Sequence, residues 1–295
     1  MLRALVLVVA IGCTHRADFG EPVDAARGNY RVATFNVRRY FDTVCASGAC
    51  GSGEYEELPS QQAFDARATQ LADALRALDA DVVSLQELET QACLDAILAR
   101  LPELPYGVLG EIGSTASVDV AVISKTPITL VVNHRATEPL ELPDGTVTTF
   151  SRELLEVHVR DGAVAIFATH FKSKSNDDPA RRLAEAQHAS RIVNELAARE
   201  PATLVVLAGD LNDTPESPPL AALTVTGGLV RVAGDLATPD QATYVFDGRG
   251  QAIDHILIGP GTAALRVPRS SQVWRETSGW GGSDHAALTS DFTLP

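Results

Sequence analysis

Six short polar segments of this 295-residue sequence combine carboxylates, imidazoles and amides, the groups that bind hard metal ions and transfer protons. Each segment ends or interrupts a short apolar run. They are Thr34–Arg38, Ser84–Glu87, Ala168–Lys174, Ala208–Pro215, Ile253–Leu257 and Gly281–Ala286. One such segment would mean little, because Asn and Asp also form ordinary turns. Six of them together indicate a functional site.

Two of these segments carry the most chemistry. Asp210 and Asn212 stand two residues apart after an apolar run, where they can position a water molecule and donate to a phosphoryl oxygen. A turn stabilised by the same side chains is the alternative. Asp284 and His285 are adjacent in a glycine-rich stretch, which makes them the best acid–base or metal-binding pair in the chain.

Two further segments gain meaning from their neighbours. His170 is followed by Lys172 and Lys174, two of the three lysines in the chain, and this group suits phosphate handling. An ordinary polar histidine is the alternative. Asp254 lies inside an apolar run, where a buried carboxylate needs a partner such as an imidazole N–H.

Apolar runs rich in Val, Ile and Leu predict buried strands. They are Tyr30–Asn36, Asp81–Gln86, Asp119–Ser124, Ala163–His170, Thr203–Gly209 and Ile253–Ile258. Helical spacing of apolar residues predicts helices at Ser60–Leu78, Thr90–Leu101 and Asp178–Arg199. Alternating strands and helices predict an α/β domain, and polar side chains at strand ends then project into a crevice. Asn36 and Glu87 end two of these strands, although each alone would suit a turn or a helix start.

Length and composition favour one large domain over residues 29–295, and we expect a monomer. The chain is 45% hydrophobic with a mean hydropathy near zero, so intrinsic disorder is excluded as a description of it. The net charge of −14 opposes tight non-specific binding to nucleic acid. It does not exclude a nuclease, because a metal ion and a few local cations can handle one phosphate.

The N-terminus predicts export. Arg3 is followed by eight apolar residues, Ala4–Ile11, which are too few to span a bilayer but suit a signal peptide. Gly12 and Cys13 then resemble the lipidation site of bacterial lipoproteins. We therefore expect a signal peptide at 1–13 with a lipid anchor on Cys13, a tether at 14–28, and a cell-envelope or secreted location. An unlipidated secretory signal, or an apolar N-terminus that is retained, is the alternative.

Three other cysteines bear on this expectation. Cys45 and Cys50 lie in a predicted Gly-rich surface loop at residues 41–59, at a spacing that permits a local disulfide. A zinc site is a poor alternative, because no CxxC pair and no nearby histidine accompany them. Cys93 is then a buried free thiol or the partner of one of the two. Residues 134–150 predict a hairpin that turns at residues 143–145.

The ordered motifs FNVR, QE, THFKSK, GDLND, IDHIL and GSDH resemble those of the endonuclease/exonuclease/phosphatase superfamily. That group includes pancreatic-type deoxyribonucleases, abasic-site endonucleases, neutral sphingomyelinases and inositol polyphosphate 5-phosphatases. The resemblance runs from Tyr30 to Phe292. It implies a four-layer α/β/β/α sandwich of two packed mixed β-sheets with flanking helices, and metal-assisted hydrolysis of a phosphoester.

The resemblance implies a metal site. Glu87 would be the principal ligand, with Asn36 and Asp284 close by. Mg²⁺ or Mn²⁺ suits such oxygen ligands better than zinc.

It also implies catalytic roles for five residues. Asp254 would orient His285, and Asp210 with Asn212 would position the attacking water and the phosphate. His170 would stabilise developing charge or protonate the leaving group.

Four positions are weaker predictions for substrate binding. Asp119 and Arg152 resemble polar residues that the family places near the site, each with a surface salt bridge as the alternative, and Lys172 follows the histidine motif. Arg38 stands where abasic-site endonucleases carry an acidic metal ligand. This difference favours the deoxyribonuclease-like branch over abasic-site repair.

The first functional hypothesis is therefore an exported or lipid-anchored nuclease that hydrolyses DNA, with RNA as a further substrate, by in-line attack of water. The second is a phosphoesterase that acts outside the cytoplasm on phospholipids or inositol phosphates. The third is an inactive binding protein on the same fold, which retention of both imidazoles, His170 and His285, argues against.

Overall fold

The computed structural model describes residues 28–277 and 279–295. The predicted signal peptide, Cys13 and all of the tether except Gly28 lie outside the described residues. Within the described ranges, no helix has the length and apolar character needed to cross a membrane.

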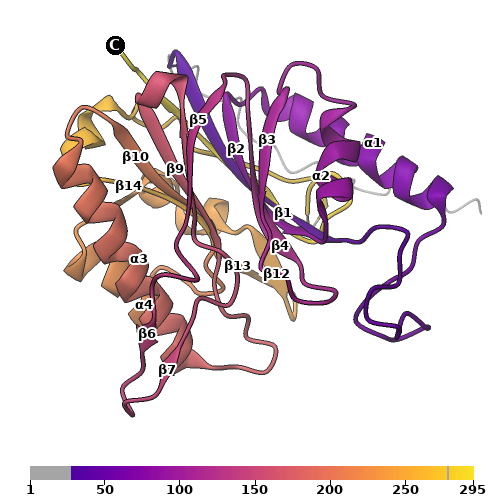
Figure 1. The fold of residues 1–295 in the computed structure, drawn as a ribbon. Helices are drawn as coiled ribbons and strands as arrows, with labels where there is room; N and C mark the ends of the chain where they lie inside the picture. Colours follow the sequence, from indigo (N-terminus) through magenta and orange to yellow (C-terminus); the bar gives the residue numbers. More distant parts are fainter. Residues whose placement is uncertain (1–27, 278) are drawn as a thin grey trace, which may run out of the picture.

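Two mixed sheets pack face to face, and helices cover their outer faces (Figure 1), which confirms the predicted four-layer sandwich. Sheet A has the strand order β15 (Gln272–Trp274), β16 (Ala287–Phe292), β1 (Tyr30–Tyr40), β2 (Val82–Leu88), β4 (Asp119–Ser124) and β3 (Tyr106–Gly110). Sheet B has the order β11 (Val230–Arg231), β14 (Asp254–Ile258), β10 (Leu204–Asp210), β9 (Val164–His170), β8 (Leu155–Val159) and β5 (Ile128–Asn133).

Helices α1 (Gln61–Leu78) and α2 (Gln91–Leu98) cover sheet A, and helices α3 (Pro179–Arg199) and α4 (Pro218–Ala221) lie on the side of sheet B (Figure 1). Ser60 caps α1 by accepting from the Ala63 amide at 3.2 Å, and Asp178 caps α3 by accepting from the Arg181 amide at 3.0 Å. These side chains satisfy amides that the first helical turn leaves free. The predicted starts at Ser60 and Asp178 are thus the cap residues themselves.

Strand periodicity divides the buried side chains among three cores. On β9, Val164 and Ile166 point between the sheets, whereas Ala165 and Phe167 point towards α3. Strand β1 likewise sends Phe35 towards α1 and α2. Alternation of this kind is the rule for a strand buried on both faces, and it fixes which residues at the strand ends face the gap between the sheets.

Some predicted boundaries differ from the structure. Strand β1 continues four residues beyond the predicted end at Asn36, through an irregular stretch, and α2 ends at Leu98 instead of Leu101. The antiparallel strands β3, β5, β8 and β16 were not predicted. Strands β8 and β16 mix polar and apolar residues, as in the buried Glu156 and His158 of β8, and β3 contains two glycines, so these three lack a continuous apolar run.

Two loop predictions also have an outcome. Cys45 and Cys50 form a disulfide rather than a zinc site, and Cys93 is free and buried. Residues 134–150 contain a hairpin of only two residues a side, β6 (Leu140–Glu141) and β7 (Val147–Thr148), and Gly145 adopts a φ of 80° in its turn. A second hairpin, β12 (Tyr244–Phe246) and β13 (Arg249–Gln251), precedes β14.

Candidate active site

A cleft of about 820 Å³ opens at one end of the sandwich, and residues from both sheets line it. Asn36 on β1 and Asp210 on β10 occupy the inter-sheet positions of their strands, two residues beyond the last small or apolar side chains of those rows. His170 on β9 and Asp254 on β14 continue the corresponding rows of their own strands. The side chains that end the apolar rows between the sheets therefore become the floor of the cleft.

Sheet B sets three of these groups side by side. Asp210 pairs in register with His170 on the parallel neighbour β9 and with Asp254 on the antiparallel neighbour β14. Gly209 allows this close arrangement, because a Cβ there would lie 1.9 Å from the carbonyl oxygen of Thr169. No larger residue fits directly before Asp210 without moving β9.

Glu87 reaches the cleft by a different route. Glu87 alternates along β2 with the same parity as Val83 and Leu85, whose side chains face the helices. In a regular strand, the Glu87 side chain would therefore point away from the cleft. The register skips Glu87 between Gln86 and Leu88, and Glu87 has a φ of 71°. This β-bulge turns its carboxylate towards the cleft at a cost in backbone strain, which is common beside functional sites.

The neighbouring end of β1 is distorted in the same way. Arg38 and Arg39 have φ values of 57° and 40°, and the register between β1 and β2 shifts here. The distortion aims the Arg39 amide at Glu87, which accepts from it through Oε2 at 2.8 Å. It also lets the Arg38 amide donate to Asn36 Oδ1 at 2.9 Å.

Asn36 joins the two sheets. Its Nδ2 donates to Glu87 Oε1 and to Asp210 Oδ2, both at 3.0 Å. Asp210 Oδ2 is in turn 3.5 Å from His170 Nε2. The amide therefore spaces two carboxylates that would otherwise repel each other across the gap between the sheets.

The donor atoms of this group fit a divalent cation. Glu87, His170 and Asp210 each offer a ligand atom, and these atoms lie within 4.8 Å of one another. His170 Nδ1 and Asp254 Oδ1 are buried without a hydrogen-bond partner among the described residues, so the site has unused ligand capacity. Two carboxylates, from Glu87 and Asp210, provide the hard oxygen ligands that suit Mg²⁺ or Mn²⁺.

His285 is held on the opposite side of Asp210. Its Nδ1 donates to Asp254 Oδ2 at 2.8 Å, and its Nε2 lies 3.8 Å from Asp210 Oδ2. The Ser283 hydroxyl donates to the backbone oxygen of Asn36 at 2.8 Å and accepts from the His285 amide at 3.0 Å. The glycine-rich loop before β16 is thereby fastened to β1, which fixes the imidazole.

The three buried groups have shifted pKa values. Burial, together with the Asp254 carboxylate, raises the pKa of Asp210 to about 7. Burial opposes the charge of His285, but the carboxylates of Asp254 and Asp210 outweigh it and raise the His285 pKa to about 10. Burial, and then the charges of Arg152 and His285, hold the pKa of His170 well below its usual 6.5. His170 is therefore neutral and His285 cationic at neutral pH.

Asn212 forms the turn that follows β10. Its φ is 54°, its amide N–H donates to Asp210 Oδ1 at 2.9 Å, and its side-chain Nδ2 donates to the Phe171 oxygen at 3.1 Å. The turn alternative recognised in the sequence is therefore part of the structure, and Asn212 also lines the cleft.

The weaker predictions divide into rim and interior. Arg38, Arg152 and Lys172 line the cleft, whereas Asp119 is fully buried and accepts from the Ser117 hydroxyl at 2.9 Å. Asp284 also lines the cleft, but it lies 3.5 Å from Arg38 and is outside the cluster around Glu87.

Several residues at the cleft were not singled out from the sequence. Tyr244 packs its ring 4.8 Å from that of His285, Ser283 anchors the glycine-rich loop, and Arg39 and Tyr55 line the cleft. Two of them had a signal in the sequence, since Arg39 follows the FNVR motif directly and Ser283 lies within the GSDH motif. The others reach the site through loops whose path no local pattern predicts.

The comparisons with known proteins agree with this geometry. The model of the Endonuclease/Exonuclease/phosphatase family matches residues 33–285, most of the chain. No curated protein matches the sequence at a significant level.

Solved structures share the fold at low identity. One is an endonuclease/exonuclease/phosphatase from Bacteroides vulgatus (18% identity, TM-score 0.63), with 90% of this chain and 99% of that chain covered. Another is truncated TDP2 from Caenorhabditis elegans (18%, 0.61), with 90% and 97% covered. A third is the 3'-5' exonuclease NExo from Neisseria meningitidis (19%, 0.59), with 90% and 100% covered.

Proposed function

Because this chain belongs to the endonuclease/exonuclease/phosphatase family, and is therefore a phosphoester hydrolase, we propose that it is a nuclease that hydrolyses DNA with Mg²⁺ or Mn²⁺. The observation that carries the proposal is the cluster of Glu87, His170 and Asp210 beside the Asp254–His285 pair. Phosphodiester hydrolysis needs a metal site, a base and a cation near the developing charge, and this cluster offers all three.

Glu87 would hold the divalent cation, with His170 and Asp210 nearby. When bound, such a cation supplies Lewis-acid stabilisation of negative charge on the phosphoryl oxygens. The Asn36 amide orients both carboxylates through its two hydrogen bonds. A cation at this position would also lower the pKa of Asp210 and so favour its ionised form.

The remaining groups divide the proton chemistry. Ionised Asp210 accepts the proton of the attacking water, which the amide of Asn212 helps to place. His285, kept cationic by Asp254, stabilises the charge of the pentacovalent transition state. The low pKa of His170 favours a role as a hydrogen-bond donor to the phosphate over one as a proton donor to the leaving group.

The cleft rim supports a phosphate-rich substrate. Five basic side chains line the cleft of this acidic protein. They are Arg38, Arg39, Arg152, Lys172 and Lys174. The same cations also suit an inositol phosphate or a phospholipid headgroup, which is the second candidate substrate class.

The test uses the protein that begins after Cys13. Plasmid DNA, RNA, sphingomyelin and an inositol phosphate are each incubated with Mg²⁺, Mn²⁺ or EDTA. Metal-dependent cleavage of DNA, lost in His285→Ala and retained in His188→Ala on α3, supports the proposal. Cleavage of the lipid or inositol phosphate alone selects the second candidate, and no cleavage of any substrate overturns both.

We also propose that the protein is exported, carries a lipid anchor on Cys13 and is a monomer. The apolar run Ala4–Ile11 before Cys13 supports export, and so does the Cys45–Cys50 disulfide, because such bonds persist in oxidising compartments. Membrane fractionation of the full chain tests the anchor, since Cys13→Ser should move the protein to the soluble fraction. Gel filtration of the protein that begins after Cys13 tests the monomer.

A further inference from the structure

The loop of residues 41–59 is a cross-linked arm beside the active-site cleft. It joins β1 to α1 and projects from the sandwich (Figure 1). The Cys45–Cys50 disulfide closes one part of it. The buried Glu56 accepts from the amides of Ala46 at 2.6 Å and Ser47 at 2.7 Å, which ties the two ends of the loop together. An arm fixed in this way can present a side chain in a defined place.

That side chain is Tyr55. It lines the cleft together with Glu87, and 52% of its surface is exposed. The Arg39 guanidinium lies 5.6 Å from its ring centroid, and Phe41 meets the ring nearly at right angles with centroids 5.8 Å apart. Burial raises the Tyr55 pKa, while the nearby cations Arg152 and Arg39 oppose this rise. Tyr55 is therefore a supported aromatic surface beside the catalytic groups.

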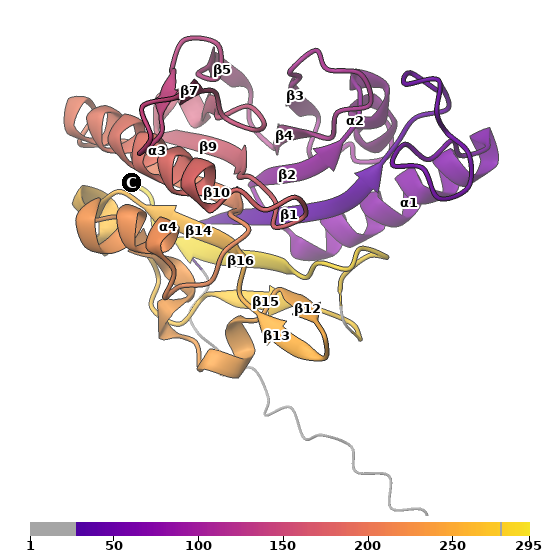
Figure 2. The ribbon, with the colours of Figure 1, turned by 90° about the horizontal axis from the view of Figure 1, so that it is seen from below.

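The other rim of the cleft is aromatic too. Phe246, at the end of β12, lines the cleft and is 56% exposed. Its hairpin and the loop of residues 41–59 lie on different sides of the strand ends (Figure 2). Tyr55 and Phe246 are thus two exposed aromatic side chains that stand beside the same cleft.

The charge of the protein makes this aromatic surface informative. The five basic side chains at the cleft can bind the phosphates of a nucleic acid, but the net charge of −14 opposes the approach of its backbone at long range. Stacking of bases on aromatic rings adds affinity that tolerates any sequence and survives salt better than ion pairs do. The bases of a duplex are already stacked and paired, so only an unpaired base offers a free face.

We propose that Tyr55 is a specificity-determining residue on which an unpaired base next to the scissile phosphate stacks, so that single-stranded nucleic acid is the preferred substrate. This inference rests on the proposed nuclease function. The disulfide and the hydrogen bonds of Glu56 hold the loop that carries Tyr55 beside the cleft that Glu87 lines. Arg39, beneath the ring, strengthens the stack by a cation–π contact.

The experiment measures kcat and KM of the protein and its Tyr55→Ala variant. The substrates are a single-stranded oligonucleotide, the duplex of the same sequence and methyl p-nitrophenyl phosphate, which carries no nucleobase. We expect Tyr55→Ala to raise KM for the single strand roughly tenfold, with kcat within about twofold. The duplex and the small ester should be cleaved as before. Tyr55→Phe should keep the low KM, because the ring and not the hydroxyl carries the stack.

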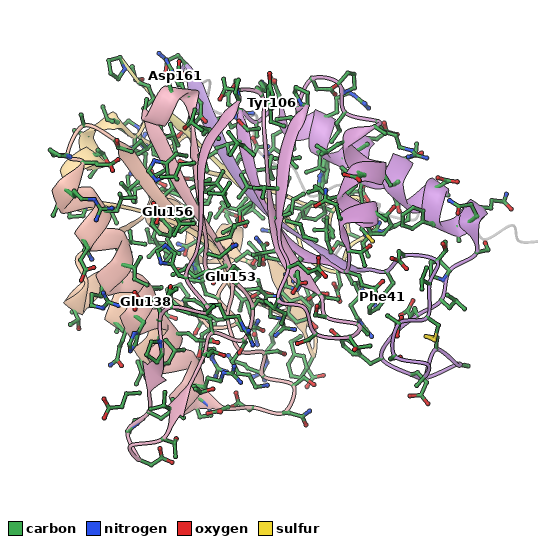
Figure 3. The ribbon with its side chains drawn as sticks, viewed as in Figure 1. Phe41, Tyr106, Glu138, Glu153, Glu156 and Asp161 are labelled. Atoms are coloured by element: carbon green, nitrogen blue, oxygen red, sulfur yellow. A yellow bond between two sulfur atoms is a disulfide. The ribbon has the colours of Figure 1, made fainter. Side chains whose placement is uncertain are left out.

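Two controls separate stacking from a structural effect. Tyr106→Ala removes another exposed tyrosine, which Figure 3 places far from Phe41 and its loop, and it should change no parameter. A single strand with abasic residues should bind the native protein as weakly as the normal strand binds Tyr55→Ala.

The outcomes separate this inference from the proposed function. Metal-dependent cleavage of the small ester without any tenfold KM difference on the single strand overturns the role of Tyr55 and leaves the hydrolase intact. An equal loss on all three substrates overturns it as well, because Tyr55 would then support the catalytic groups. If the native protein cleaves none of the three, the nuclease proposal itself fails.

Discussion

Sheets A and B share one plan but deliver their polar groups to the cleft in different ways. Each has a central parallel pair joined by a crossover helix, β1–α1–β2 in sheet A and β9–α3–β10 in sheet B. In sheet B the pairing is regular up to His170 and Asp210. In sheet A the register breaks at the same level, and Glu87 is turned by a bulge.

The difference shows which active-site side chains can be placed from the alternation of residues along a strand alone. In sheet B, an acid or imidazole at the correct parity reaches the cleft because the strand stays regular. In sheet A, regular alternation would point Glu87 towards the helices, and its left-handed backbone conformation turns the side chain into the cleft instead. The carboxylate of Glu87 accepts hydrogen bonds from Asn36 and Arg39, and these bonds offset the cost of its strained backbone.

The largest effect should come from sheet B. Asp210→Asn removes the base but keeps the shape of the side chain, so kcat should fall about 10³-fold, within the range for loss of a general base. Steady-state kinetics on DNA with saturating Mg²⁺ measure it, and Asp240→Asn on the surface is the matched control. A loss that high Mg²⁺ restores would show that Asp210 is mainly a metal ligand, which would contradict its proposed role as the base.

The next effect should come from sheet A. Glu87→Gln weakens the metal site, so the Mg²⁺ concentration for half-maximal activity should rise roughly 10- to 100-fold. A Mg²⁺ titration of activity measures the shift, with Glu141→Gln in the exposed hairpin as the control. A lower kcat at an unchanged Mg²⁺ requirement would contradict the assignment of Glu87 as the principal metal ligand.

The sheets should also differ in their response to acid. Sheet B carries His158, His170 and His255 on its strands, whereas the six strands of sheet A contain no histidine. Burial lowers the His255 pKa to about 4, while its Nε2 donates to the Asp213 oxygen at 2.9 Å. The unfolding free energy that depends on neutral His255 is therefore fully present above pH 6.5, the pKa of histidine in the unfolded chain. It decreases as the pH falls towards 4, the pKa in the folded protein.

The variant His255→Gln isolates this contribution, because glutamine can still donate to Asp213. Between pH 6.5 and 4, the native protein should lose up to ~3 kcal/mol more unfolding free energy than the variant. Urea unfolding at several pH values measures the difference. Parallel pH profiles of the two proteins would contradict it, and hydrogen exchange should show β14 losing protection before β1.

The smallest effect concerns the contact between the sheets. Ser84 on β2 donates to the Ala208 oxygen on β10 at 2.9 Å and accepts from Gln86 Nε2 at 2.8 Å. Ser84→Ala leaves both groups buried with fewer partners and should cost about 1–2 kcal/mol of unfolding free energy. Ser52→Ala on the exposed loop should change stability by less than about 0.5 kcal/mol. A fall in kcat at a temperature where Ser84→Ala is still fully folded would show that this contact also positions the catalytic groups.

Much of the site was visible in the sequence because regular strands carry it. His170 and Asp210 were predicted at strand ends and Asp254 inside a strand, and the structure places the three on adjacent strands at one level. Their roles in catalysis stay predictions. Asp284 shows the limit of such reasoning, since its neighbour His285 lies beside Asp210 while Asp284 itself lies near Arg38.

By itself the sequence determined the alternation of buried strands with helices, the helix starts at Ser60 and Asp178, and the family to which the chain belongs. These follow from periodicity, capping and short motifs, which are local properties. Only the tertiary structure decided that Glu87 turns into the cleft and that Tyr55 stands beside it. Both depend on contacts between residues far apart in the chain, such as Asn36 with Asp210, and on strain that such contacts offset.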